Sequence, residues 1–277
     1  MRNLYSSYPA SQPGLYVAML KNLLLFLITG YVLFFILAYF FTDKLIFFPP
    51  SPGYHDSDQV IKIPTANGAV IAAFYLPNKQ AKYTLLISHG NAEDIGYMLP
   101  WLRALQQHGF AVFAYDYEGY GLSSGKSNEQ NTYNDINAAY DYLTRKINIP
   151  ANKIIAYGTS IGAAVTIDLA SREPIAGIIL QSPFTSALRV VTRVKIFPFD
   201  KYNNLKKITK ITCPILFIHG TSDRIVAIWH GKKLYQTAQA PKQYLWVPGA
   251  GHNDLIYVAG TSYWQALDRF VRLLSEP

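Results

Sequence analysis

Residues 22–41 form an unbroken run of twenty positions without a charged side chain, most of them large and apolar. At about 1.5 Å per residue, a helix of this length measures about 30 Å, which matches the hydrocarbon core of a bilayer. Lys21 precedes the run, and Asp43 and Lys44 follow it. Because a helix here would have no polar face, it does not suit the surface of a globular domain, and we predict a transmembrane helix over residues 22–41.

Two other interpretations of this run are a cleaved signal peptide and a buried core helix. A signal peptide has an apolar core of about 7–15 residues that ends in small residues, whereas this run ends in Tyr39, Phe40 and Phe41. We therefore predict a retained, single-pass N-terminal anchor. Basic residues before the run, Arg2 and Lys21, favour the orientation with the N-terminus in the cytoplasm.

After the run, prolines at positions 49, 50 and 52 prevent helix from continuing. The remaining chain alternates short apolar runs with segments of helical spacing, which is typical of an α/β domain with a mostly parallel sheet flanked by helices. Such sheets bind ligands at the carboxyl ends of their strands. Eight strands are predicted, over residues 60–63, 70–76, 84–88, 111–115, 153–157, 177–181, 215–219 and 243–247. The main helices are predicted around 95–105, 136–143, 161–170 and 264–274.

The sequence Gly-Thr-Ser-Ile-Gly at residues 158–162 lies between a predicted strand and a predicted helix. This is the pattern of a nucleophile elbow, a tight turn that exposes the central serine and needs small residues on either side. Ser160 is therefore the candidate nucleophile. The backbone N–H of Ile161 would open the following helix, where it can stabilise an oxyanion.

A serine hydroxyl needs a base to remove its proton. His252 lies in a loop after the last predicted strand, which is where this type of fold carries its base, so we select it. Of the other histidines, His55 lies in the connector, His108 in a helical segment and His89 in a loop. We interpret His219 and His230 as structural.

The acid that orients the base should follow an earlier strand. Asp223 comes soon after the strand at 215–219 and is the natural choice. Asp254 is a rival, but it lies only two residues from His252, and side chains that close in sequence rarely face one another. Asp116 follows the strand at 111–115, and we interpret it as a brace between loops.

The second oxyanion donor should come from the loop after the strand at 84–88. Gly90 lets the backbone approach closely there, so the N–H of Asn91, or that of Ala92, can face the site. No cofactor is indicated, because the chain has neither a phosphate-binding glycine loop nor histidines and carboxylates at metal-ligand spacing. Its single cysteine, Cys213, excludes an internal disulfide framework and a cysteine-based zinc site.

Several motifs occur together and in a fixed order: SHGNAEDIG, YDYEGYGLSSG, YGTSIG, DLASR, SPFTSALRV, ILFIHGTSD and PGAGHND. With them the chain resembles the α/β-hydrolase superfamily, and within it the depalmitoylating α/β-hydrolase domain-containing 17 family and the membrane-anchored α/β-hydrolase 13 group. The resemblance implies an α/β-hydrolase fold and a Ser-Asp-His triad of Ser160, Asp223 and His252 that cleaves acyl esters or thioesters. The depalmitoylases carry a cysteine-rich, lipid-modified N-terminal tail, whereas this chain has no cysteine before Cys213.

The segment between the strand at 177–181 and that at 215–219 has room for only a short cap of one or two helices. Between residues 185 and 212 it combines several large apolar side chains with seven basic residues, opposed only by Asp200. Such a segment can lie on an anionic bilayer, or it can form a solvated helix packed on the sheet. Nucleic acid is not indicated as a partner, because no nucleic-acid-binding motif accompanies the positive charge. The seven residues are Arg189, Arg193, Lys195, Lys201, Lys206, Lys207 and Lys210.

The sequence therefore predicts a membrane-anchored serine hydrolase with a lipid membrane and an acyl ester or thioester substrate as its partners. The ester could belong to a lipid, a lysophospholipid or an acylated protein. Two alternatives are a serine aminopeptidase-like hydrolase, for which Glu93, Asp94 and Glu118 could capture an amine, and a non-catalytic binding module on the same fold. The predicted divisions are a tail over 1–21, a transmembrane helix over 22–41, a juxtamembrane connector over 42–58 and a catalytic domain over 59–277.

Overall fold

The structure is a computed structural model, and it describes residues 13–192 and 200–275. It divides into two compact units, Met1–Thr42 and Asp43–Pro277. The eight strands and most of the helices belong to the second unit, which carries every residue discussed as a candidate for catalysis.

Helix α1 (Pro13–Ile46) has 34 residues and contains the predicted run. The part of it that is long and apolar enough to cross a membrane is Tyr16–Ile36. The helix is longer than the predicted 22–41 at both ends, and its last five residues lie within the predicted connector. Elongation of an existing helix is favourable, so the polar turn around Asp43 and Lys44 continues it. It ends at Ile46, shortly before Pro49 and Pro50.

The second unit contains an eight-stranded sheet in the order β1-β2-β4-β3-β5-β6-β7-β8. Strands β1 and β2 are antiparallel to each other, and β2 is antiparallel to β4, while the pairs from β4 to β8 are parallel. The prediction of a mostly parallel eight-stranded sheet is thus confirmed. The strands are β1 (Ile61–Pro64), β2 (Val70–Leu76), β3 (Thr84–Ser88), β4 (Ala111–Tyr115), β5 (Ile154–Thr159), β6 (Gly177–Gln181), β7 (Ile215–Gly220) and β8 (Lys242–Val247).

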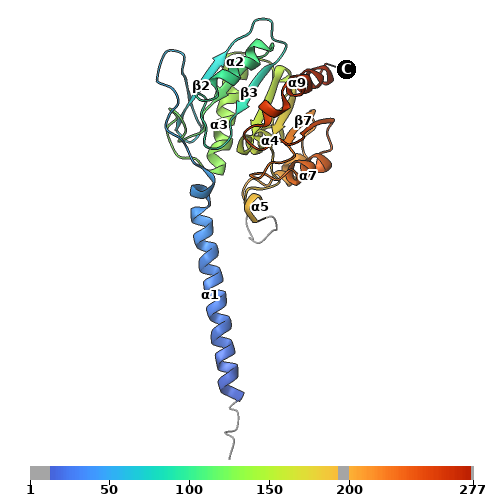
Figure 1. Ribbon diagram of the computed structural model, residues 1–277. Coiled ribbons are helices and arrows are strands. Elements are labelled where there is room, and N and C mark those ends of the chain that lie inside the picture. Colours follow the sequence, from blue (N-terminus) through green and yellow to red (C-terminus); the bar gives the residue numbers. More distant parts are fainter. Residues whose placement is uncertain (1–12, 193–199, 276–277) are drawn as a thin grey trace, which may run out of the picture. The chain divides into compact units, whose positions relative to one another are not determined.

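Helices cover both faces of this sheet (Figure 1), and alternate residues of each strand supply the two cores. On β3, for example, Leu86 belongs to one core while Leu85 and Ile87 belong to the other. This alternation follows from the two-residue period of a strand. Helices α3 (Glu129–Asp141), α4 (Ile161–Ala170), α6 (Asn204–Ile208) and α7 (Trp229–Thr237) pack on the first face, and α2 (Leu99–Gln107), α8 (Leu255–Ala259) and α9 (Thr261–Leu273) on the second.

Helix α2 begins at Leu99, although the apolar spacing predicted helix from Ile95. The difference arises at Pro100, which has no backbone N–H to donate to the Gly96 carbonyl oxygen and therefore fits only the first turn of a helix.

The segment after β6 contains two short helices, α5 (Ala187–Thr192) and α6, within the described residues. This agrees with the predicted short cap of one or two helices. Arg193 and Lys195, which belong to the predicted basic surface, lie outside the described residues.

Candidate active site

Ser160 lies between β5 and α4 with φ 54° and ψ −111°, a backbone conformation that residues other than glycine rarely adopt. Its own N–H donates to the carbonyl oxygen of Gln181 in β6, at 2.8 Å. This bond fixes the turn against the neighbouring strand. Strained backbone of this kind is typical of functional sites, where the surrounding structure holds it in place.

The glycines on either side of Ser160 leave no room for a side chain. A Cβ at Gly162 would lie 2.0 Å from the carbonyl oxygen of Ser88, and one at Gly158 would lie 2.2 Å from that of Gly162. The turn therefore packs directly on the end of β3. The motif at residues 158–162 thus corresponds to a real steric requirement and is more than a compositional coincidence.

His252 lies in the loop after β8, and its Nδ1 is 2.7 Å from Oδ2 of Asp223, which follows β7. The second carboxylate oxygen, Oδ1, accepts from the N–H groups of Ile225 and Val226 at 2.9 and 2.8 Å. Both oxygens are thereby oriented. The two loops are also joined by a bond from Ser222 N–H to the carbonyl oxygen of Ala250, at 2.9 Å.

The environment of Asp223 keeps it ionised. Burial alone would raise the pKa of this carboxyl, but hydrogen bonds from His219 and His252, with the charge of His252, hold the pKa below its usual range. His219 is fully buried, and its Nε2 lies 3.4 Å from Asp223 and 2.8 Å from the carbonyl oxygen of Val226. Its interpretation as structural agrees with this position, which buttresses the loop that carries Asp223.

The rival acid, Asp254, is engaged elsewhere: its Oδ1 accepts from the N–H of Gly251, in its own loop, at 2.7 Å. His89 is wholly buried, and burial lowers its pKa to about 4. Asp116 accepts from Tyr54 Oη and from the N–H of Ile95 and so joins separate loops. Burial raises the pKa of Asp116 to about 7.

Two backbone N–H groups remain available as oxyanion donors. Those of Ile161, the first residue of α4, and of Asn91, in the loop after β3, donate no hydrogen bond within the described part of the chain. The alternative donor, Ala92 N–H, bonds to the side-chain oxygen of Asn91 at 2.9 Å. Gly90 N–H bonds to Glu93 Oε1 at 2.7 Å. Of the two donors considered in this loop, Asn91 is therefore the one whose N–H is free to act.

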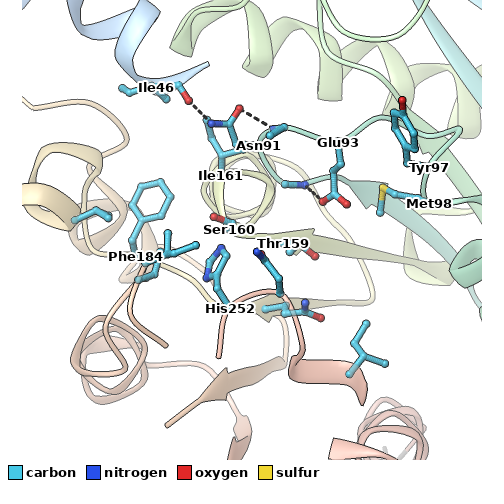
Figure 2. A pocket seen from close by; sticks show the side chains of 18 of the residues that line it. Ile46, Asn91, Glu93, Tyr97, Met98, Thr159, Ser160, Ile161, Phe184 and His252 are labelled. Carbon is cyan, nitrogen blue, oxygen red and sulfur yellow. Dashed lines mark hydrogen bonds between the residues drawn. The ribbon is translucent and has the colours of Figure 1, made fainter. Parts of the chain in front are cut away.

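Ser160, His252, Asn91 and Ile161 line one cavity of about 750 Å³. In Figure 2 the His252 ring is directed toward Ser160. No hydrogen bond joins their side chains in the described structure, and such bonds are often long before substrate binds. The remaining lining is mostly apolar and comes from several loops; it includes Ile46, Met98, Trp101, Phe184, Val190, Ile225 and Ile256.

Sequence reasoning did not identify these apolar residues of the cavity wall. Their side chains are of the same types as those in the core, and they lie far apart along the chain, so no local pattern marks them.

Of the three carboxylates considered for amine capture, only Glu93 lines the cavity. Asp94 accepts from the N–H of Gly53, and Glu118 from the side-chain amides of Asn67 and Asn131.

Three of the five described cations of the predicted basic surface contact other residues of the protein. Lys207 pairs with Asp168 at 2.7 Å, Lys201 pairs with Asp43, and Arg189 lies over the ring of Trp229. Lys206 and Lys210 are exposed. Three of these basic side chains therefore help to hold the short cap against the rest of the domain.

Among the described residues, no group of three or more His, Cys, Asp or Glu side chains could hold a metal ion.

The chain is similar to proteins of known family along most of its length. A family model described as Hydrolase_4, serine aminopeptidase S33, matches residues 79–199. Human alpha/beta hydrolase domain-containing protein 17B is 39% identical, covering 84% of this chain and 90% of that protein. Alpha/beta hydrolase domain-containing protein aho-3 of Caenorhabditis elegans is 37% identical, covering 83% and 77%. The solved esterase Pf2001 of Pyrococcus furiosus shares the fold, with a TM-score of 0.70 at 20% identity over 82% of this chain and 97% of that one.

Proposed function

The chain belongs to the alpha/beta hydrolase domain-containing 17 family of hydrolases, and from that membership we propose that it is a membrane-anchored serine hydrolase that cleaves carboxylic esters or thioesters of acyl chains. The observation that carries the proposal is the 2.7 Å contact between His252 and Asp223 in the cavity loops beside the strained Ser160. This arrangement supports the roles of nucleophile for Ser160, base for His252 and orienting acid for Asp223.

In the proposed reaction, Nε2 of His252 takes the proton of the Ser160 hydroxyl as its oxygen attacks the substrate carbonyl. Asp223 keeps the second ring nitrogen protonated and stabilises the imidazolium that forms. The negative charge that develops on the carbonyl oxygen is stabilised by the N–H groups of Ile161 and Asn91. Collapse of the tetrahedral intermediate breaks the ester or thioester bond, and His252 returns the proton to the leaving alcohol or thiol. Water then hydrolyses the acyl-enzyme by the same steps.

Two features support an acyl chain as the part of the substrate that is bound. The cavity walls are mostly apolar, with Met98, Trp101, Phe184 and Ile225 among them, and burying a methylene group there is favourable by about 0.8 kcal/mol. The chain also carries a helix long and apolar enough to span a bilayer, Tyr16–Ile36, which supports delivery of the substrate from a membrane.

The decisive test uses full-length protein in detergent micelles, with a fluorophosphonate probe and a panel of p-nitrophenyl esters and acyl thioesters. We expect labelling and turnover, and we expect Ser160→Ala to lose at least about a thousandfold in kcat/KM, because only binding and oxyanion contributions remain. Ser171→Ala makes the same change at a residue whose hydroxyl bonds the carbonyl oxygen of Asp168, outside the cavity, and should keep wild-type activity. Intact protein that neither reacts with the probe nor hydrolyses any member of the panel would refute the proposal.

An aminopeptidase-like reaction is the second candidate, and the position of Glu93 favours it. This carboxylate lines the cavity and would attract a free amino group. Burial raises the pKa of Glu93, and its Oε1 already accepts a hydrogen bond from Gly90 N–H. Aminoacyl p-nitroanilides belong in the same panel: turnover of these that exceeds ester turnover, and that is lost in Glu93→Gln, would favour the peptidase.

A further inference from the structure

Residues 43–48, which we call the strap, comprise the last turn of α1 and the two residues that follow it. They belong to the same compact unit as the sheet and the cavity. Ile46 lines the cavity, and Phe47 is buried in the core beside it. The strap therefore forms part of the cavity wall and is more than a tether between a membrane helix and a separate domain.

On one side, the strap is held by the side chain of Asn91. Its Nδ2 donates to the carbonyl oxygen of Ile46 at 2.6 Å, and its Oδ1 accepts from the N–H of Phe48 at 2.9 Å (Figure 2 draws the first of these). Ile46 ends α1, so its carbonyl has no partner within the helix and needs one from outside. Tyr120 completes the contact, because its hydroxyl donates to Asn91 Oδ1 at 2.6 Å.

On the other side, the strap is joined to the short cap. Asp43 forms an ion pair with Lys201, and the carbonyl oxygen of Lys201 accepts from the N–H of Ala187 at 2.8 Å. Ala187 begins α5 and lines the cavity. The strap thus contacts both the loop after β3 and the cap, which are far apart in sequence and face the same cavity.

We propose that Asn91 is a positioning residue through its side chain, and that the strap thereby sets the orientation of the oxyanion donor. This inference rests on the proposed function, in which the backbone N–H of the same residue stabilises the oxyanion. The loop around it is strained: Ala92 has φ 58°, and its N–H bonds to Asn91 Oδ1. The amide side chain therefore fixes the loop backbone and the strap at once.

Loss of the side-chain contacts would release this strain and let the peptide before Asn91 rotate. A displacement of about 1 Å at a catalytic group can lower the rate about a hundredfold. Since the N–H stabilises charge that exists only in the transition state, the effect should fall on kcat and leave KM almost unchanged.

The test compares full-length variants in detergent micelles on a short p-nitrophenyl ester. Asn91→Asp keeps the size but removes the donor to Ile46, Asn91→Ala removes the side-chain contacts without adding charge, and Tyr120→Phe removes one hydroxyl. The matched control is Tyr140→Phe, because the Tyr140 hydroxyl bonds the carbonyl oxygen of Pro174, outside the cavity.

We expect kcat to fall about 10- to 100-fold in both Asn91 variants and several-fold in Tyr120→Phe, with KM within about twofold of wild type and Tm close to that of the control. Labelling by a fluorophosphonate, whose phosphoryl oxygen takes the place of the oxyanion, should slow in parallel. Unchanged kcat in both Asn91 variants would overturn the inference, and so would a loss of activity that only follows a lower Tm or a higher KM. If wild type itself shows no activity and no labelling, the proposed function has failed instead.

Discussion

Replacing Gly162 by alanine adds one methyl group at the point where the elbow packs on the end of β3. The new Cβ would lie 2.0 Å from the carbonyl oxygen of Ser88 and 2.6 Å from that of His89. Both are backbone atoms, and His89 directly precedes the loop that carries the candidate oxyanion donor. The clash therefore cannot be relieved by a side-chain rotation, and either the elbow or this loop must move.

The size of the displacement follows from the contact distance. Separations between carbon and oxygen below about 3 Å are not tolerated, so the two segments must separate by about 1 Å, a large strain for a close-packed interior. Overpacking of this kind lowers the free energy of unfolding by about 1–3 kcal/mol. A shift of about 1 Å between nucleophile and oxyanion donors is expected to lower kcat about a hundredfold.

Activity and stability would be measured together, with p-nitrophenyl ester turnover and thermal unfolding of full-length protein in the same detergent. The matched control is Gly30→Ala in α1, where an added Cβ meets nothing within 4 Å. We expect Gly162→Ala to lose about a hundredfold in kcat and several degrees in Tm, and Gly30→Ala to retain both. If Gly162→Ala matched the control in both measurements, the close approach of the elbow to β3 would be wrong.

Two further predictions concern buried carboxylates. Asp223→Asn should lower kcat about 10³- to 10⁴-fold, because the amide neither fixes the histidine tautomer nor stabilises the imidazolium. Steady-state kinetics would measure this loss. The control is Asp254→Asn, which alters the hydrogen bond to Gly251 N–H and should keep kcat within about threefold of wild type. An equal loss in the two variants would contradict the assignment. Burial raises the pKa of Asp116 to about 7. Between about pH 4 and 7, the folded protein therefore holds a proton on this carboxyl that the unfolded chain has released. The free energy of unfolding consequently falls as pH rises through this window. Asp116→Asn should therefore show a smaller decrease in Tm between pH 5 and pH 8 in thermal-shift assays, and an unchanged decrease would rule out this carboxyl as its source.

Local patterns were enough to predict most of the fold. Each of the eight predicted runs became a strand, and the runs in the middle of the chain became strands buried on both faces, such as β3, β4 and β6, because a strand of that kind needs an unbroken apolar stretch. The elbow was also predictable, since its backbone approaches other backbone so closely that only small residues fit on either side of Ser160, and small residues at this spacing are visible in the sequence. The boundaries of α1 and α2 were less accurate, because they depend on how helix ends and turns satisfy their hydrogen bonds.

The composition of the candidate site was only partly predictable. Strand order along the chain pointed to loops whose residues should meet at the carboxyl edge, and Ser160, Asp223 and His252 were selected on that basis. The structure adds what position alone cannot give: Asp223, and not Asp254, faces His252, and Asn91 rather than Ala92 has a free N–H.

The amino-acid sequence by itself determined where the strands, the apolar helix and the serine turn lie along the chain, because each carries a local pattern of side-chain types. Only the tertiary structure decided which apolar side chains line the cavity and that the end of α1 bonds to Asn91. These contacts join segments that are distant in sequence, and their formation depends on how the sheet brings its loops together. No pattern of nearby residues records that geometry.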